Sequence, residues 1–298
     1  MDMQWDDMKI FLAVARHESL SGAGRVLRVD PATVGRRIAR LEEVLGAPLF
    51  AKSPQGYALT DAGQRMLAHA EGAEQSMGAA MAEMQGQAGE LSGTIRIGAP
   101  DGCANYLLPQ VCNRIVRANP DLDVQIVALP RVINLSRREA DLVIGVSPPT
   151  AGRLTVQKIT DYKLHLAASR WYLKNSPPLA TLGDLHQHRV VGYIPDMIFD
   201  KELDYLAEMG AERVALASNS VSVQFNWVRQ GGGVGVVHDF AIPSAKGIIK
   251  VLPHAFSLTR SFYLIRHADD RRLERMNRFA EALSEGLRAE VQKLEAQA

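Results

Sequence analysis

The change in residue pattern near residue 93 most restricts the folds open to this chain. Before it, hydrophobic residues recur mainly at the three- and four-residue spacing of helices; after it, short apolar segments typical of strands alternate with helical ones. The second pattern requires a sheet covered by helices. At 298 residues the chain has room for two or three modules. We expect an α/β fold class, with a small, mainly helical module over residues 1–60, a linker helix and hinge over 61–93, and an α/β domain over 94–298.

Composition and motif content exclude several kinds of protein. The chain has 47% hydrophobic and 22% charged residues, and no uninterrupted apolar segment is long enough to cross a bilayer. The first apolar segment follows acidic residues and contains Lys9 and Arg16, unlike a secretory signal, so we expect a cytoplasmic protein. Cys103 and Cys112 are too few for a disulfide framework or a zinc site, and neither paired metal-binding histidines nor a GxSxG motif occurs. We expect no metal, no cofactor and no enzymatic activity.

The segment "VDPATVGRRIARLE", residues 29–42, predicts a helix with a definite start. Asp30 suits the N-cap, and Pro31 suits the first helical position because its missing N–H has no helical partner there. Gly46 and Pro48 supply the stop. The buried stripe consists of Val34, Ile38, Leu41 and Leu45. The side chains left on the outward face are Thr33, Arg36, Arg37 and Arg40.

Two further helices and a hairpin complete the first module. A short helix capped by Ser21 is expected just upstream, with a turn around Val29, which gives a helix-turn-helix. A supporting helix precedes it, with apolar spacing at Met8, Phe11, Leu12 and Ala15. In "PLFAKSPQGYALT", two short apolar segments flank the turn-forming "SPQG", which predicts a small β-hairpin, or wing.

The charge of this module leaves two interpretations of its arginines open. The whole chain has a net charge of only +1, but seven basic and four acidic side chains between Arg16 and Lys52 give this region a local excess of +3. The outward arginines either contact a polyanion or form a solvated face, some of them paired with Glu42 or Glu43 on neighbouring turns.

The segment from Thr60 to Gln87 predicts one long helix rich in Ala, Met, Glu and Gln. Its apolar positions alternate at steps of four and three, at Met66, Ala70, Ala73, Met77, Ala80 and Met84. Such a stripe requires a partner helix, so we interpret the segment as a dimerising linker. The alternative is a helix packed on its own domain.

The remainder of the chain predicts two α/β subdomains. Strands are expected at "TIRIGAP", "DVQIVAL", "ADLVIGV", "YKLHLAAS", "RVVGYI", "RVALAS", "GVGVVHD", "IIKVL" and "SFYLIRH", with helices over 106–118, near Trp171, over 222–230 and from Arg271 onward. A short exposed helix is expected over 136–142. Because open α/β sheets bind ligands beyond the carboxyl ends of their strands, the loops after "TIRIG", "VQIVAL", "VVGYI" and "VALAS" are the candidate ligand loops.

At this point the sequence resembles the LysR-type transcriptional regulators. The stretch from Phe11 through "SLSGAGRVLRVDPATVGRRIARLEEVLGAPLF" to "GYALTDAGQRML" matches the family's order of helix, turn, recognition helix, "LE..LG..LF" and "LT.AG". In that family the recognition helix enters the major groove of DNA and the wing lies on the backbone. The resemblance implies double-stranded DNA as a partner. It places DNA contacts on Ser21, Thr33, Arg36, Arg37, Arg40, Lys52 and Ser53.

The chemistry of these side chains suits DNA. Arg36 or Arg37 can make a bidentate contact to guanine O6 and N7, and Thr33 an apolar contact to a thymine methyl group. Phosphate contacts are assigned to Ser21, Arg40 and Lys52. The sequence departs from the family at two positions, where Gly35 replaces a common serine and Lys52 a common arginine.

The C-terminal part resembles the family's co-inducer domain, which is itself similar to a periplasmic binding protein. "IGAPDGCANYLLP" lies at the position of the first ligand loop, and "VQFNWVRQGGGVGVV" matches the family's helix, glycine turn and strand. The resemblance implies a small-molecule effector in the cleft between the subdomains, and a homodimer that often pairs into a homotetramer. The candidate effector contacts are Pro100, Asp101, Gly102, Cys103, Arg131, Tyr193, Phe199, Ser218, Asn219 and Ser220.

The first ligand loop differs from that of many homologues, which have Ser or Thr there and bind small carboxylates. Here Pro100, Asp101 and Gly102 occupy it. A carboxylate at Asp101 would repel an anionic effector, which favours an amine, a polyol or a ligand held mainly from the other loops. Alternatively, Asp101 only caps the helix that follows it.

Other signals are given structural interpretations. "GGGVG", residues 231–235, follows a helix and precedes a strand, which indicates a helix end and a tight turn and not a phosphate loop. Cys103 near a helix N-terminus is a minor candidate for redox sensing. His238 beside Asp239 indicates a strand-end polar pair. The competing function is an enzyme or solute-binding protein whose N-terminal module serves only for assembly; it predicts turnover, or ligand binding that is indifferent to DNA.

Overall fold

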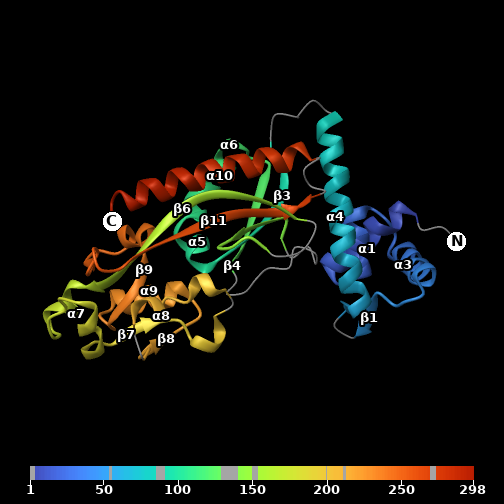
Figure 1. Cartoon of the computed structure of the whole chain (residues 1–298). Helices are drawn as coiled ribbons and strands as arrows, with labels where there is room; N and C mark the ends of the chain where they lie inside the picture. The colour runs from blue at the N-terminus through green and yellow to red at the C-terminus, as the bar shows by residue number, and fades with distance from the viewer. Residues whose placement is uncertain are drawn as a thin grey trace. The chain divides into compact units, whose positions relative to one another are not determined.

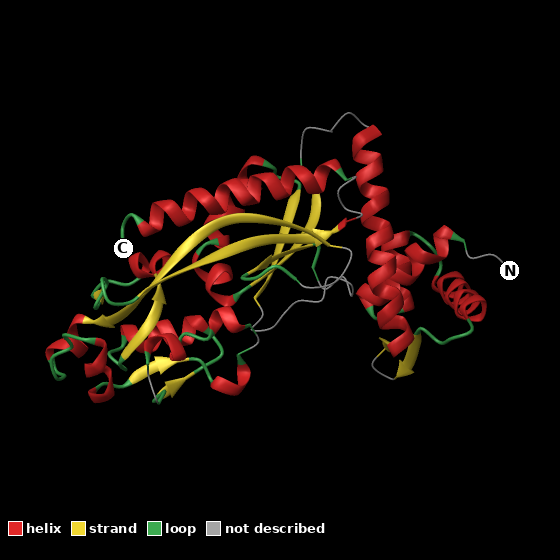
Figure 2. Ribbon diagram, in the orientation of Figure 1, coloured by secondary structure: helices red, strands yellow, loops and turns green. Residues whose placement is uncertain are grey.

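The computed structural model describes residues 4–53, 56–84, 91–128, 140–149, 154–198, 200–210, 213–268 and 273–298. The chain divides into two compact units, Met1–Gly89 and Glu90–Ala298, called the N-terminal and C-terminal units below. Helices dominate the first unit, and the second combines a large sheet with helices (Figures 1 and 2). Within the described residues, no helix has the length and apolar character needed to span a membrane. The finer division of the chain at residues 60 and 93 stays a prediction.

Three helices build the core of the N-terminal unit: α1 (Trp5–His17), α2 (Leu20–Leu27) and α3 (Pro31–Leu45). Phe11 and Val34 are fully buried in the core that the three helices share. The predicted start of α3 is confirmed, because the Asp30 carboxylate accepts hydrogen bonds from the backbone N–H groups of the first turn. The predicted cap of α2 is wrong by two residues: Ser19 accepts from the Gly22 N–H at 2.9 Å, and Ser21 lies exposed inside the helix.

The predicted wing is an antiparallel hairpin of β1 (Phe50–Ser53) and β2 (Gly56–Leu59). The Glu42 side chain of α3 accepts hydrogen bonds from the backbone N–H groups of Leu49 and Phe50 at 2.7 and 3.0 Å. Glu42 therefore fixes the start of the wing, whereas the solvated-face interpretation had offered it as a partner for an arginine on a neighbouring turn. Gly56 has a φ of 135°, and a Cβ there would lie 2.4 Å from the carbonyl oxygen of Glu18, so only glycine fits.

The predicted linker is the helix α4 (Asp61–Met84), which begins after Thr60, whose hydroxyl accepts a hydrogen bond from the Gly63 N–H. Its first half packs on its own unit: Ala70 is fully buried in the core of the N-terminal unit, and Met66 packs against that core. Met77, further along, is 52% exposed. Self-packing therefore accounts for the start of the apolar stripe, and the stripe continues beyond it.

The described residues of the C-terminal unit form one nine-stranded sheet. One part, the first subdomain, contains β3 (Gly93–Ala99), β4 (Leu122–Ala128) and β5 (Leu142–Gly145), with β3 parallel to both neighbours. The other part, the second subdomain, contains β7 (Val190–Gly192), β8 (Leu216–Ala217) and β9 (Val234–His238), with β7 parallel to both neighbours. Two subdomains are confirmed.

Two long strands join these subdomains. They are β6 (Leu154–Ser169) and β11 (Ser257–His267), which pair antiparallel along most of their length (Figure 1). β11 also pairs with β5, while β6 also pairs with β9 and with β10 (Ile248–Lys250). The sequence predicted only "YKLHLAAS" and "SFYLIRH" of these strands, because their first residues lack the continuous apolar character that marks a buried strand.

Helices cover the sheet and supply the loops at its strand ends. They are α5 (Asp101–Tyr106), α6 (Leu108–Ala118), α7 (Arg170–Lys174), α8 (Leu206–Met209), α9 (Val221–Arg229) and α10 (Glu274–Glu295). The helix predicted over 106–118 is confirmed as α6, which begins two residues later than predicted, and a separate short helix, α5, precedes it. The glycine turn after α9 is confirmed: Gly231 has a φ of 76°, and the Gly232 N–H donates to the Trp227 carbonyl. The helix predicted over 136–142 lies mostly outside the described residues.

Candidate functional site

The outer face of α3 carries the predicted DNA contacts in two different environments. Arg36 is exposed, and its guanidinium donates to the Thr33 hydroxyl at 3.0 Å. Arg37 is half-buried, with its guanidinium 3.9 Å from carboxylate oxygens of both Asp6 and Asp7 on α1. At that distance the attraction is weak and leaves the hydrogen-bonding fork of Arg37 available.

Arg40 is engaged more firmly with α1. Its guanidinium lies 2.6 Å from Asp7 Oδ2, and it also donates to Gln4 Oε1 at 2.9 Å. Asp7 is only 2% exposed, so the pair neutralises a carboxylate inside the core. Arg37 and Arg40 thus pair with carboxylates of α1, while Arg36 bonds to a hydroxyl of its own helix.

The other predicted DNA contacts lie on α2 and the wing. Ser21 is exposed in the first turn of α2. Lys52 and Ser53 lie on β1, opposite Tyr57 and Gly56 in the hairpin register, and their side chains lie outside the description.

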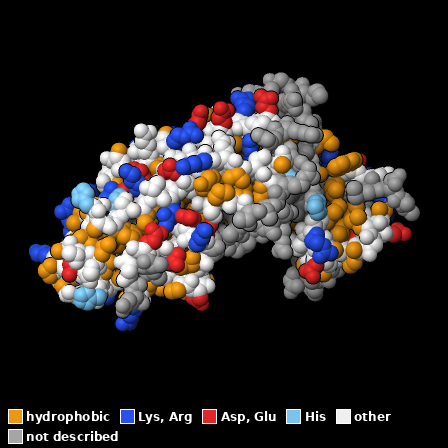
Figure 3. Space-filling model, in the orientation of Figure 1, with side chains coloured by type: hydrophobic (Ala, Val, Ile, Leu, Met, Phe, Trp, Pro, Cys, Tyr) orange, Lys and Arg blue, Asp and Glu red, His pale blue; other side chains and the backbone are white. Residues whose placement is uncertain are grey.

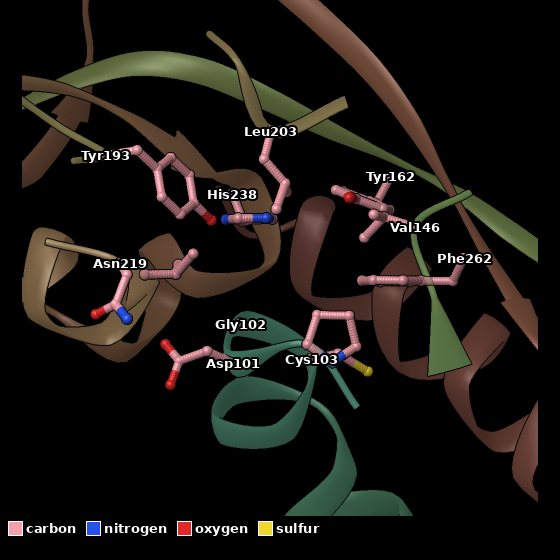
Figure 4. Close-up of a pocket in the computed structure, with 12 residues that line it drawn as sticks. Asp101, Gly102, Cys103, Val146, Tyr162, Tyr193, Leu203, Asn219, His238 and Phe262 are labelled. Carbon is pink, nitrogen blue, oxygen red and sulfur yellow. The ribbon is translucent and has the colours of Figure 1, made fainter. Parts of the chain in front are cut away.

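Three of the four predicted ligand loops of the C-terminal unit, those at "TIRIG", "VVGYI" and "VALAS", contribute to one cleft (Figure 4), and the loop after "VQIVAL" lies outside the described residues. Six predicted residues line it: Pro100, Asp101, Gly102, Cys103, Tyr193 and Asn219. Six further residues complete the lining: Val146, Tyr162, Leu203, Val221, His238 and Phe262. The space left for the centre of a water-sized molecule is about 20 Å³, room for one or two waters. The cleft is therefore closed in this structure.

Asp101 does not cap its own helix. Its Oδ2 atom accepts a hydrogen bond from the Ser222 N–H at 2.8 Å and from the Ser220 hydroxyl at 3.1 Å, both at the N-terminus of α9. Its Oδ1 atom accepts from the Asn105 side chain at 3.1 Å. The expectation that Asp101 caps the helix after it is therefore wrong: it caps a helix of the other subdomain.

Aromatic rings form another wall of the cleft. Tyr162 of β6 stacks on Phe262 of β11 with ring centroids 4.2 Å apart, and on His238 at the end of β9 at 5.4 Å. His238 is 5% exposed, and its Nδ1 atom has no hydrogen-bond partner among the described residues. Burial lowers the pKa of His238 to about 4, against the opposing influence of Asp239 and Asp101. His238 is therefore neutral at neutral pH.

Both cysteines are buried. Burial raises the pKa of the Cys103 thiol well above its usual range and that of Cys112 to about 11. The thiolate that oxidation requires is thus disfavoured at both positions, which opposes redox sensing by Cys103.

The remaining predicted effector contacts fall around the cleft or outside the description. Ser218 and Ser220 flank Asn219, and the Ser218 hydroxyl accepts from the Ser220 N–H at 3.1 Å. Arg131 and Phe199 lie outside the described residues. Sequence reasoning missed Tyr162 and Phe262, which lie within long strands, where an aromatic side chain carries no signal of a ligand.

His238 was interpreted wrongly. Asp239 pairs instead with two other side chains, His165 Nδ1 at 2.8 Å and Lys250 Nζ at 2.8 Å. His238 ends strand β9, so the rule that ligands lie beyond strand carboxyl ends would have found it.

The C-terminal unit has no extended basic region on the face seen in Figure 3, where Lys and Arg side chains are interspersed with Asp and Glu. No group of three His, Cys, Asp or Glu side chains suited to a metal ion occurs among the described residues. The structure thus defines a class of protein: a winged helix-turn-helix unit joined to an α/β unit with a cleft between two subdomains.

Two protein-family models match this chain and identify its class. Residues 5–64 match the bacterial regulatory helix-turn-helix protein, lysR family, and residues 88–288 match the LysR substrate binding domain. The chain belongs to the LysR family of transcriptional regulators.

Individual relatives of the chain are also transcriptional regulators. The transcriptional regulator PtxR of Pseudomonas aeruginosa is 26% identical over 251 residues, covering 82% of this chain and 80% of PtxR. The Mau operon transcriptional activator of Paracoccus denitrificans is 25% identical over 264 residues, covering 88% of this chain and 89% of the activator.

Solved structures show the same fold. A full-length OxyR variant of Pseudomonas aeruginosa has a TM-score of 0.67 at 18% identity and covers 97% of this chain and 95% of its own. Full-length LysG of Corynebacterium glutamicum, with bound effector Arg, has a TM-score of 0.58 at 20% identity and covers 96% of this chain and 100% of its own.

Proposed function

We propose that the protein binds specific DNA sites through the N-terminal unit and regulates transcription in response to a small molecule in the cleft of the C-terminal unit. The observation that carries this proposal is the joint presence of an exposed arginine face on α3 and a cleft built from both subdomains. The relatives are transcriptional regulators and activators, which supports a regulator and not an enzyme. Because its target is DNA, the proposed location is the cytoplasm.

The proposed DNA contacts differ in role. Arg36 and Arg37 are assigned to base edges, because both present guanidinium groups on the outward side of α3 without a close ion pair. Thr33, at the start of the same face, is assigned to a thymine methyl group. Arg40 keeps a phosphate contact in addition to its pair with Asp7. Ser21, Lys52 and Ser53 are assigned to the backbone.

The proposed assembly is a homodimer through α4 that can pair into a homotetramer. The exposed Met77 continues the apolar stripe beyond the part of α4 that packs on its own unit. A second copy of α4 is the partner that would cover this stripe. Two recognition helices would then read paired half-sites.

The proposed switch is a shift between closure states of the two subdomains. Both long strands, β6 and β11, run from one subdomain to the other. A ligand in the cleft would contact both subdomains at once. A ligand that prefers one closure state shifts the population toward it. The shift changes the placement of the DNA-binding units in the oligomer and thereby DNA affinity or bending.

The test is selection of a binding site from random DNA, followed by fluorescence anisotropy with excess competitor. We expect wild type to prefer the selected site over random DNA, and Arg36→Ala with Arg37→Ala to lose this preference while remaining folded. Equal binding of both proteins to both DNAs would contradict a reading role for α3. Turnover of a small molecule, without any DNA preference, would favour the solute-binding or enzyme alternative.

A further inference from the structure

The N-terminus of α9 is already occupied by a carboxylate from the other subdomain. The Ser222 N–H, in the first turn of α9, donates to Asp101 Oδ2 at 2.8 Å, although Asp101 lies 121 residues earlier in the chain. The Ser220 hydroxyl donates to the same oxygen at 3.1 Å. The next first-turn donor, the Val223 N–H, is taken by the Ser220 side chain at 3.3 Å. Two donors of this first turn, the N–H groups of Ser222 and Val223, are thus taken by Asp101 and Ser220.

A helix N-terminus favours negative charge, because its free N–H groups and the helix dipole both point toward an anion. In an α/β cleft, this is the position where an effector carboxylate gains most. Here the protein supplies that carboxylate itself. The contact also joins α5 of the first subdomain to α9 of the second, so it holds the cleft closed.

The rest of the cleft lining offers no positive charge that would compensate a second anion. Among the described residues that line the cleft, Asp101 is the one with a charged side chain, and the others are polar, apolar or aromatic. His238 is the group that protonation would make positive, but it is 95% buried and neutral at neutral pH. Its ring lies against the first loop, with Cε1 3.5 Å from the Cβ position of Gly102. An effector carboxylate here would face Asp101 without a cation, which is costly in a dry site.

The buried Nδ1 of His238 points to what the cleft does accept. It has no partner among the described residues, while the ring lines the cleft beside Tyr162 and Tyr193 (Figure 4). Neutral imidazole presents one donor and one acceptor nitrogen. A molecule with an apolar body and a hydrogen-bonding group would satisfy it without adding negative charge.

We propose that Asp101 determines the specificity of the cleft: its carboxylate occupies the anion position at the N-terminus of α9, so the cleft admits effectors without negative charge and rejects carboxylates. This inference rests on the proposed function, since it names the chemical class of that site's ligand. It assigns to Asp101 the place that a ligand carboxylate would otherwise take.

The experiment is chemical rescue of Asp101→Ala by acetate, followed by thermal unfolding of the full chain. Removal of the carboxylate leaves the Ser222 N–H without its partner, so we expect the Tm to fall by about 2–6 °C. Acetate, at constant ionic strength against chloride, should then raise the Tm of Asp101→Ala. Wild type should not respond, because its own carboxylate fills the site.

Two further variants make the result specific. Asp101→Asn keeps an oxygen acceptor and fills the space, so we expect a small Tm change and no acetate response. Asp123→Ala removes an exposed carboxylate from β4 of the same unit and should behave as wild type. Should Asp101→Ala not fold in chloride, the yield of refolding in acetate against chloride gives the same comparison.

An equal acetate response in Asp101→Ala and Asp123→Ala would overturn the inference, as would the absence of an acetate response in Asp101→Ala, whether or not its Tm is lowered. A rise in the Tm of wild type with acetate alone would also overturn it. None of these measurements involves DNA. Failure of DNA binding therefore contradicts the proposed function and leaves the rescue result standing, and failure of the rescue leaves DNA binding standing.

Discussion

The N-terminus of α9 and the outer face of α3 treat positive charge in opposite ways. At α9, the positive end of the helix meets Asp101 of the same chain at 2.8 Å. On α3, the exposed Arg36 donates to the neutral Thr33 hydroxyl and Arg37 stays 3.9 Å from the nearest carboxylates. A surface that keeps its positive charge available suits an external polyanion, and a site that neutralises it internally does not. The same physical rule thus assigns DNA to one unit and an uncharged or cationic ligand to the other.

The largest expected effect comes from removing the arginines on the outer face of α3. Because a bidentate base contact contributes about 1–3 kcal/mol, Arg36→Ala with Arg37→Ala should lower the affinity for the selected site roughly 100-fold or more. Fluorescence anisotropy measures it. Arg117→Ala, an exposed arginine on α6, is the matched control and should bind as wild type. A similar loss in the control would mean that general charge, and not the α3 face, carries the binding.

The next effect concerns the cleft. The folded-state pKa of His238 is about 4, below the ordinary value of 6.5, because the folded state favours the neutral imidazole. The contribution of this preference to stability is fully present above pH 6.5. As the pH falls from 6.5 toward 4, the unfolded state binds the proton first, and stability should fall by up to about 3 kcal/mol.

Urea unfolding at several pH values, compared with His238→Phe, checks this prediction. The variant keeps a ring against Tyr162 and should lose most of the pH dependence over that interval. His254→Phe, at an exposed position, should retain it. Identical curves for His238→Phe and wild type would show that the cleft does not exclude the proton.

A smaller effect separates the arginines of α3 from one another. Arg40→Met leaves the buried Asp7 carboxylate without its 2.6 Å partner and should destabilise the protein by about 2 kcal/mol. Arg36→Met, on the exposed side, should change stability by less than about 0.5 kcal/mol. Urea unfolding measures both. Adding Asp7→Asn to Arg40→Met should recover part of the loss; no recovery would remove the ion pair as the cause.

The smallest effect distinguishes backbone from base contacts. Lys52→Ala should weaken binding to selected and random DNA alike and reduce the slope of log affinity against log salt by about 1. Anisotropy over a salt series gives the slope. Arg36→Ala is the comparison, because a base contact mainly alters the ratio of specific to random affinity. A change of that ratio in Lys52→Ala would indicate that Lys52 contacts a base and not the DNA backbone.

The features predicted well from sequence are those that local chemistry decides. Asp30 and Pro31 start α3, and Val34, Ile38 and Leu41 of the predicted stripe are buried, since both signals lie within one helix. Leu45, predicted for the same stripe, is wrong: it lies in the last turn and is 41% exposed. The cap of α2 failed because two serines in "ESLSG" satisfy the same pattern, and only the path of the chain shows that Ser19 faces the free N–H groups.

Features that depend on distant contacts were beyond the sequence. Arg40 pairs with Asp7, 33 residues away, whereas helical spacing pointed to Glu42 and Glu43. Six of the ten predicted effector contacts line the cleft, since strand-end loops can be located from periodicity. The aromatic wall was missed, because Tyr162 and Phe262 meet only when β6 and β11 pair.

The most direct test of the whole account is the effect of acetate on DNA binding by Asp101→Ala. The protein is titrated onto the selected site by anisotropy and footprinting, in acetate and in chloride of equal ionic strength, beside wild type. The account predicts that acetate changes the affinity or the footprint of Asp101→Ala and not of wild type, because filling the site at α9 alters subdomain closure and hence the placement of the α3 helices. If acetate raises the Tm of Asp101→Ala yet leaves its DNA binding identical in both salts, the cleft does not control DNA binding.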